Sequence, residues 1–165
     1  MGFLTGKTAI ITGAGRAVLK DGSCGSIGYG IATAYAKEGA NLVITGRNVK
    51  KLEAAKQELE SLYGIKVLTV QADVCAGGDN EATVANVVKQ AVDTFGGIQV
   101  LINNAQASAS GVPLAEHTTE QFDLAIYSGL YAAFYYMKAC YPYLAESHGS
   151  AVSYTHLRAH ETRGN

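Results

Sequence analysis

Residues 7–28 read KTAIITGAGRAVLKDGSCGSIG and decide the fold. The stretch opens on an apolar β-branched run that ends at Thr12, passes a glycine-rich turn at 13–15, and enters a helical pattern near Ser26. Such a turn lets the backbone approach a pyrophosphate, which the free amides and partial positive charge of a helix N-terminus then attract. The stretch therefore predicts a phosphate-binding strand, turn and helix.

The spacing of the turn departs from the usual G-x-G-x-x-G pattern. Arg16, Ala17 and Val18 follow Gly13-Ala14-Gly15, so no glycine stands where the third is required, and glycines also make ordinary tight turns. Residues 17–25 are extra, which the fold tolerates because doubling a loop costs only about 0.6 kcal/mol. We expect this insertion, with Lys20, to lie near the entrance of the site.

Apolar runs and helical patterns alternate along the rest of the chain. Runs that are apolar throughout predict strands buried on both faces, and helices between them make the sheet parallel with right-handed crossovers. The expected strands are 7–12, 41–45, 66–71, 98–102 and 150–154, and the expected helices are 27–38, 49–63, 80–95 and 119–144. The pattern predicts a doubly wound parallel α/β sheet of about five strands in three α/β/α layers, incomplete at its C-terminal edge.

The length of 165 residues predicts a single domain, which we place at 1–152. Residues 153–165 form a polar tail that resembles read-through of adapter sequence, so we expect it to be non-native or disordered. His156 and His160 are four residues apart in this tail, without a neighbouring glutamate or a third ligand, and we predict no metal site.

Composition excludes several partners. Charged residues make up 16% of the chain and the net charge is −1, which favours neither nucleic acid nor an anionic membrane. No apolar run approaches the roughly 20 residues of a membrane span, and the N-terminus lacks a signal-peptide pattern. Three cysteines without a CxxC pair fit a reducing compartment. We therefore expect a cytoplasmic protein.

Four motifs carry a resemblance to a known family. They are Thr12-Gly13-Ala14-Gly15-Arg16, Ser26-Ile27-Gly28, Asp73-Val74 and Asn103-Asn104-Ala105. In this order and spacing they resemble the short-chain dehydrogenase/reductase family over residues 5–152. The resemblance implies a Rossmann-like fold, an NAD(H) or NADP(H) cofactor, and interconversion of an alcohol with a carbonyl in a small-molecule substrate.

The resemblance also implies which residues bind the cofactor. Near the pyrophosphate and its ribose it places Thr12, Gly13, Arg16, Ile27 and Gly28. Beside the adenine it places Asp73 and Val74, and against the ribose on the nicotinamide side it places Asn103 and Ala105. Two alternatives remain open: Asp73 is a loop cap, or Asn103 and Asn104 close a turn after the fourth strand.

The end of the second strand bears on the choice of cofactor. An acidic residue there would bind a ribose 2′-hydroxyl and repel a 2′-phosphate, but the strand closes on Thr45-Gly46-Arg47-Asn48. The fork-shaped guanidinium of Arg47 suits a phosphate, and Arg16 is expected on the same side. We predict NADP(H) over NAD(H); the alternative is that Arg47 is a solvated residue at a helix start.

The catalytic groups that the resemblance implies are not found in the chain. No tyrosine is followed four residues later by lysine, Gly129 stands where the family has a helical asparagine, and Gln106 replaces a glycine. We therefore assign no catalytic residue and expect this chain to be inactive. Two further readings are a non-catalytic dinucleotide-binding module (a pseudo-enzyme or a truncation product) and a relative of enoyl-thioester reductases, suggested by Ser26 at the helix start.

The long helix expected at 119–144 is apolar around most of its circumference. Tyr127, Tyr131 and Tyr135 form a stripe beside further large apolar residues. Such a helix must be covered on two sides, one of them by the sheet. We predict that the other side contacts a second copy of the chain, as the resemblance also implies.

Overall fold

The computed structural model describes residues 2–75 and 80–154. Residues 155–165, which hold most of the expected polar tail together with His156 and His160, lie outside the described residues.

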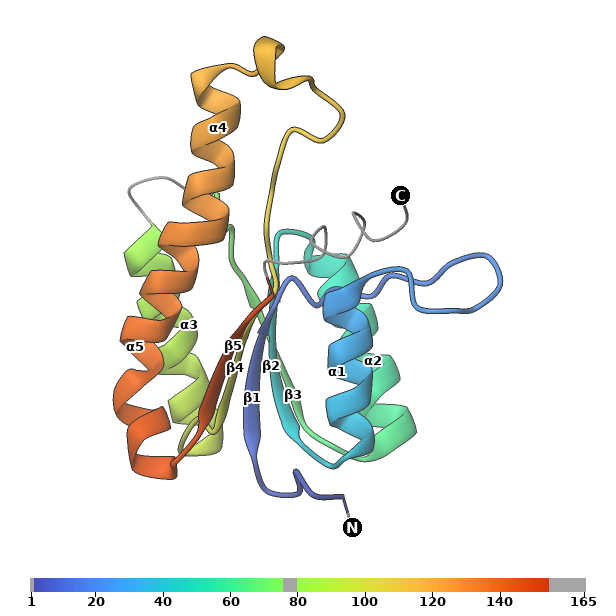
Figure 1. The fold of residues 1–165 in the computed structure, drawn as a ribbon. Coiled ribbons are helices and arrows are strands. Elements are labelled where there is room, and N and C mark those ends of the chain that lie inside the picture. The colour runs from blue at the N-terminus through green and yellow to red at the C-terminus, as the bar shows by residue number, and fades with distance from the viewer. Residues whose placement is uncertain (1, 76–79, 155–165) are drawn as a thin grey trace, which may run out of the picture.

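Five parallel strands form one sheet in the order β3-β2-β1-β4-β5 (Figure 1). Their bounds are β1 Thr8–Thr12, β2 Asn41–Gly46, β3 Val67–Gln71, β4 Val100–Asn103 and β5 Ser150–Ser153. The first three strands step outward from β1, and the chain then crosses back to place β4 on its other side. The predicted doubly wound parallel sheet is confirmed.

Helices cover both faces of the sheet and make three layers (Figure 1). On one face lie α1 (Ile27–Lys37) and α2 (Val49–Tyr63); on the other lie α3 (Asn80–Phe95) and α5 (Ala132–Ser147). Strand β1 is buried along its whole length, and its residues divide between two apolar clusters. Ala9 and Ile11 pack toward α1 and α2, whereas Ile10 packs toward α3 and α5.

Local chemistry explains where α1 and α2 begin and end. Ser26 caps α1 by accepting a hydrogen bond from the Tyr29 amide, and Asn48 caps α2 by accepting one from the Lys51 amide. Helix α2 ends at Gly64, whose left-handed backbone conformation is unstrained in glycine. These caps set the entry of each helix at the same edge of the sheet, beside the ends of β1 and β2.

The expected long helix is present but is not uniform. It consists of α4 (Thr119–Ile126), a π-helical turn η3 (Tyr127–Tyr131) and α5, and it is preceded by the short 3-10 turn η2 (Leu114–Glu116). In the π-turn, the Ser128 hydroxyl lies 2.8 Å from the Leu124 carbonyl oxygen and accepts a hydrogen bond from the Ala107 amide at 2.9 Å. This attachment to the loop after β4 accompanies the widened turn.

The last strand extends one residue into the segment that we expected to be a tail. Ser153 of β5 pairs in register with Asn103 of β4, and the Tyr154 amide donates to the Asn103 carbonyl oxygen at 2.8 Å. Unlike β1, β5 is exposed along its length. Within residues 2–75 and 80–154, none of the helices combines the length and apolar character needed to cross a membrane.

Candidate functional site

The candidate site lies at the carboxyl ends of β1, β2, β3 and β4, where the chain order of the sheet reverses on either side of β1. This is the place where open α/β sheets bind ligands. Four cavities meet there because neighbouring cavities share Gly13, Ala105 or Gln106 among their lining residues.

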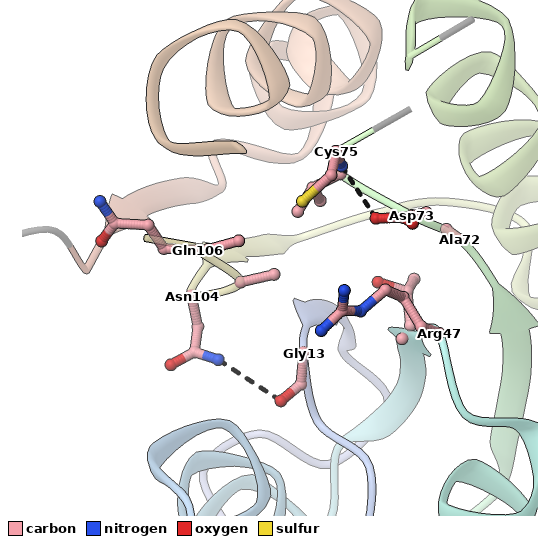
Figure 2. A pocket seen from close by; sticks show the side chains of 12 residues that line it. Gly13, Arg47, Ala72, Asp73, Cys75, Asn104 and Gln106 are labelled. Atoms are coloured by element: carbon pink, nitrogen blue, oxygen red, sulfur yellow. Dashed lines mark hydrogen bonds between the residues drawn. The ribbon is translucent and has the colours of Figure 1, made fainter. Parts of the chain in front are cut away.

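The central cavity has a volume of about 220 Å³ (Figure 2). It is lined by Gly13, Thr45, Gly46, Arg47, Ala72, Asp73, Val74, Cys75, Asn104, Ala105, Gln106 and Ala107. In Figure 2 the Arg47 side chain extends from the end of β2 toward the middle of this space, whereas Gln106 points away from it. The loops after four strands therefore build the cavity.

Two further cavities flank the glycine-rich turn. The helix-end cavity, of about 450 Å³, is lined by Gly13, Gly25, Ser26, Ile27, Gly28, Asn104, Gln106, Ser108 and Tyr154. The Arg47 cavity, of about 260 Å³, is lined by Gly13, Gly15, Ala17, Ser26, Gly46, Arg47, Asn48, Lys51 and Leu52. Side chains of the turn do not fill these spaces.

The fourth or inner cavity is smaller, about 10 Å³, and lies between the strand ends and the helices η3 and α5. It is lined by Thr12, Val74, Asn103, Ala105, Gln106, Ser128, Gly129, Ala132, Ala133, Tyr136 and Tyr154.

Glycine is required at two places where the turn meets α1. Gly13 has φ +71°, a left-handed conformation that side-chain-bearing residues rarely adopt. At Gly28, a Cβ atom would collide with the carbonyl oxygen of Gly13. The absence of a side chain at both residues brings the backbone of the turn against the first turn of α1, where helix amides lack intrahelical partners.

Thr12 and Asn104 lock the turn to the end of β4. The Thr12 hydroxyl oxygen accepts hydrogen bonds from the amides of Asn104 and Ala105, both at 2.9 Å. In return, Asn104 Nδ2 donates to the Thr12 carbonyl oxygen at 2.8 Å and to that of Gly13 at 3.5 Å, the second of which is drawn in Figure 2. Asn104 thus holds a neighbouring strand and does not close a turn of its own.

Arg16 is directed away from the cavities. Its Nε donates to the Glu58 carboxylate on α2, and its amide donates to the Lys51 carbonyl oxygen at 2.8 Å. The hydrogen bond from Arg16, and next to it the influence of the Tyr29 hydroxyl, lowers the pKa of Glu58 below its ordinary value. Within the described part of the chain, Arg16 lines none of the four cavities.

Asp73 caps the loop after β3 and also lines the central cavity. Its Oδ1 accepts a hydrogen bond from the Cys75 amide at 2.9 Å (Figure 2). Burial, then the charge of Asp73, raises the pKa of the Cys75 thiol, and Arg47 opposes this rise. Asp73 therefore both caps this loop and lines the cavity. Its carboxylate and the Arg47 guanidinium have opposite effects on the pKa of the same Cys75 thiol.

Nine of the ten residues expected to bind a cofactor line these cavities, Arg16 being the exception. Gly13, Arg47, Asp73, Val74 and Ala105 line the central cavity; Ile27 and Gly28 line the helix-end cavity; Thr12 and Asn103 line the inner cavity. Lining residues that our expectation did not include are, among others, Asn104, Gln106, Lys51 and Cys75. Their positions depend on neighbouring loops that local sequence patterns do not bring together.

The insertion at 17–25 folds back as a small hairpin. Val18 and Cys24 form an antiparallel bridge, and the Gly25 amide donates to the Ala17 carbonyl oxygen at 2.8 Å. The base of the hairpin touches the site, because Ala17 lines the Arg47 cavity and Gly25 lines the helix-end cavity. Lys20 is exposed and lines none of the cavities described here.

Comparison with known proteins agrees with this architecture. A family model described as "Enoyl-(Acyl carrier protein) reductase" matches residues 22–165. The 12alpha-hydroxysteroid dehydrogenase of a Clostridium species is 59% identical over 154 residues, which cover 93% of this chain and 57% of that protein.

Solved structures show the same fold. L-Sorbose reductase from Gluconobacter frateurii, complexed with NADPH and L-sorbose, superimposes with a TM-score of 0.78 at 30% identity, covering 93% of this chain and 53% of that one. An alcohol dehydrogenase from the archaeon Thermococcus sibiricus, complexed with 5-hydroxy-NADP, gives 0.77 at 29% identity, covering 89% and 57%. The chain thus spans little more than half the length of these relatives. Its fold, its motifs and the family match together show that it belongs to the short-chain dehydrogenase/reductase family of oxidoreductases.

Proposed function

We propose that this chain is the cofactor-binding part of an NADP(H)-dependent oxidoreductase that interconverts an alcohol and a carbonyl. The observation that carries the proposal is the contact between Gly13 and Gly28, which leaves the backbone at the start of α1 open to two cavities. A dinucleotide pyrophosphate fits there because the helix end supplies amide donors and positive potential, and no side chain occupies the turn.

In this proposal the backbone of Gly13, Ile27 and Gly28 binds the pyrophosphate. Asp73 and Val74 flank the adenine, and Ala105 and Asn103 support the ribose on the nicotinamide side. Thr12 and Arg16 hold the turn in place without facing the ligand: the Thr12 hydroxyl is bonded to the loop after β4, and Arg16 is bonded to Glu58.

Preference for NADP(H) over NAD(H) rests on the Arg47 cavity. Arg47 and Lys51 both line it, and the capping residue Asn48 at the end of β2 provides no carboxylate that would repel a 2′-phosphate. Two solved relatives, with NADPH and with 5-hydroxy-NADP, carry the phosphorylated form of the cofactor. The support for this preference is thus the positive charge of Arg47 and Lys51 at the Arg47 cavity.

When bound, the reduced cofactor would donate a hydride to the carbonyl carbon, and the oxidised cofactor would accept one from the alcohol carbon. For the substrate we propose a secondary alcohol and its ketone, with a hydroxysteroid as the first class to test. The support is the 59% identity to a protein named 12alpha-hydroxysteroid dehydrogenase.

Titration with reduced cofactor, followed by the change in nicotinamide fluorescence, tests the binding function. We expect saturable NADPH binding that is tighter than NADH binding, and a loss of about 10- to 100-fold in NADPH affinity on Arg47→Ala, the usual effect of one charged hydrogen bond. Lys51→Ala should weaken binding in the same direction. Lys50→Ala is the matched control, because Lys50 neighbours Lys51 and lines none of the four cavities. Tighter NADH binding, or no effect of Arg47→Ala, would overturn the preference.

A second candidate is a dinucleotide-binding module without turnover. The observation that favours it is the lack of any tyrosine followed four residues later by lysine in these 165 residues. Loss of an acid–base group costs about 10²–10⁴ in rate. Saturable NADPH binding without NADPH consumption in the presence of a ketosteroid would support this candidate for the chain as given, whereas measurable turnover would exclude it.

We also propose that two copies of the chain associate through the long helix. Leu130, Phe134 and Tyr141 are 63%, 51% and 71% exposed, and the stacked rings of Tyr127 and Tyr131 lie on the same helical stretch, with centroids 5.1 Å apart. Contiguous apolar patches of this kind rarely stay exposed on a monomer.

We propose a cytoplasmic setting on the basis of the cysteines. Cys24, Cys75 and Cys140 are all free, and Cys75 lines the central cavity, where a thiol persists best under reducing conditions.

A further inference from the structure

Two buried polar atoms at the inner cavity have no hydrogen-bond partner among the described residues. They are the hydroxyl oxygen of Tyr136 on α5 and Oδ1 of Asn103 at the end of β4. Tyr136 is 1% exposed and Asn103 is 8% exposed, and both residues line this cavity. Buried polar groups are almost always hydrogen-bonded, so this pair calls for a partner.

Two of the other three hydroxyls that line the cavity are already engaged, and the third belongs to Tyr154, which is 40% exposed. The Thr12 hydroxyl accepts two amide hydrogen bonds, and the Ser128 hydroxyl binds the Ala107 amide and the Leu124 carbonyl oxygen. The amide nitrogen of Asn103 lies 3.4 Å from the Ser153 hydroxyl. If the oxygen and nitrogen of the Asn103 side-chain amide were exchanged, an unpaired donor would take the place of the unpaired acceptor. Asn103 therefore needs a partner whichever way its amide is oriented.

The volume of the inner cavity and the hydrogen bonds that its two unpaired atoms need indicate which molecule can bind there. A volume of about 10 Å³ is close to the least that holds a single water molecule and is too small for an organic group. The partner must accept a hydrogen bond from the Tyr136 hydroxyl and donate one to Asn103 Oδ1, and water does both. Burial raises the pKa of Tyr136 to about 12, so its hydroxyl is protonated and can donate at neutral pH. The Thr45 side chain lies near enough to lower this pKa, but it does not reach hydrogen-bond geometry with the Tyr136 hydroxyl.

We infer that the inner cavity binds one structural water that bridges the Tyr136 hydroxyl to Asn103. The bridge joins α5 to the end of β4, one residue before Asn104, whose side chain holds the glycine-rich turn. The water is therefore part of the support behind the candidate cofactor site and not a ligand of the cofactor itself. Asn103 is also proposed to support the ribose on the nicotinamide side, so the water is sought in the chain without cofactor, where its presence does not depend on the proposed function.

The unfolding equilibrium in urea distinguishes a Tyr136 hydroxyl that is hydrogen-bonded to water from one that has no partner. We expect Tyr136→Phe to raise the unfolding equilibrium constant about five- to tenfold, the effect of losing a buried hydrogen bond. Tyr135→Phe is the matched control, since this neighbouring ring on α5 is only partly buried, and we expect less than a twofold change. Equal or greater stability of Tyr136→Phe would overturn the inference, because removing an unsatisfied hydroxyl costs nothing.

A crystal structure of the whole chain, at a resolution that shows ordered waters, identifies the partner directly. The expected result is one water within hydrogen-bond distance of the Tyr136 hydroxyl and the Asn103 side chain. A direct hydrogen bond from Tyr136 to Asn103 or Thr45, or a dry cavity, would refute the bridge even if Tyr136→Phe is destabilising. NADPH affinity, measured on the same variants, reports separately on the proposed function.

Discussion

Arg16 leaves the glycine-rich turn and pairs with Glu58 of α2 through its Nε, so its charge serves the packing of two segments and not the cleft. The Tyr29 hydroxyl of α1 also lowers the pKa of the same carboxylate. The three side chains connect the turn, α1 and α2 on the face of the sheet that carries the Arg47 cavity.

This contact predicts a pH dependence of stability. Because the folded-state pKa of Glu58 is lowered, the stabilisation that its carboxylate contributes is present above the unfolded-state pKa and is lost as pH falls through the folded-state value. Between neutral pH and about pH 3, we expect wild type to lose more unfolding free energy than Glu58→Gln. The difference should be modest, since both side chains are about a third exposed. Parallel pH profiles in urea unfolding would contradict this assignment.

Arg16→Ala is expected to leave the ratio of NADPH to NADH affinity unchanged while lowering thermal stability. The guanidinium is bonded to Glu58 and lines none of the described cavities, whereas Arg47 lines two. Cofactor titrations of Arg16→Ala and Arg47→Ala, run side by side, check the contrast. A collapse of NADPH preference in Arg16→Ala would show that this side chain turns toward the ligand.

Gly28→Ala should remove cofactor binding and destabilise the fold by about 1–3 kcal/mol, the usual cost of overpacking. The added Cβ would collide with the backbone carbonyl of Gly13, which cannot move without displacing the turn. Gly30→Ala is the control within the same helix: its Cβ would meet only Cys24 Sγ at 3.3 Å, and alanine favours a helix. Equal NADPH affinities of the two variants would argue against a binding site at this turn.

Cys75 offers a readout of cofactor binding that does not require turnover. It lines the central cavity and its thiol pKa is raised, so we expect slower alkylation at pH 8 than at the exposed Cys24. Saturating NADPH should slow the reaction of Cys75 further and leave that of Cys24 unchanged. Mass spectrometry of alkylated peptides measures both rates. Equal protection of both cysteines would indicate a global effect and not occupancy of the cavity.

Phe134→Glu should weaken self-association at micromolar concentration, measured by sedimentation velocity, because a carboxylate in an apolar contact loses its hydration. Leu62→Glu on α2 is the matched control, being 63% exposed on a different face of the molecule. A wild-type chain that sediments as a monomer throughout would refute the proposed contact.

Most of the fold could be predicted from local patterns. The bounds of the helices at 49–63 and 80–95 agree with the structure, since residues such as Asn48 and Gly64 mark helix ends by their own chemistry. Continuous apolar runs likewise identified the buried parallel strands. These features depend on residues close together in sequence, which is why the sequence alone is sufficient.

Features that depend on distant partners could not be predicted. Arg16 resembles a phosphate ligand by its position in the motif, but its partner Glu58 is 42 residues away. The π-turn occurs where Ser128 binds Ala107, 21 residues away. In both cases the sequence specified the residue type, and the tertiary structure determined what it contacts.

The π-turn also absorbs one residue without changing which face of α5 meets the sheet. Ala132, Tyr136 and Cys140 are buried at intervals of four residues, so one stripe of α5 faces the sheet. A π-helical turn holds one residue more than an α-helical turn, so deleting a single residue between 127 and 131 would restore ordinary helical pitch while α5 keeps nearly the same stripe toward the sheet. A change of one residue in length at this point is therefore compatible with the existing core, and its cost falls on the attachment of Ser128 to the loop after β4.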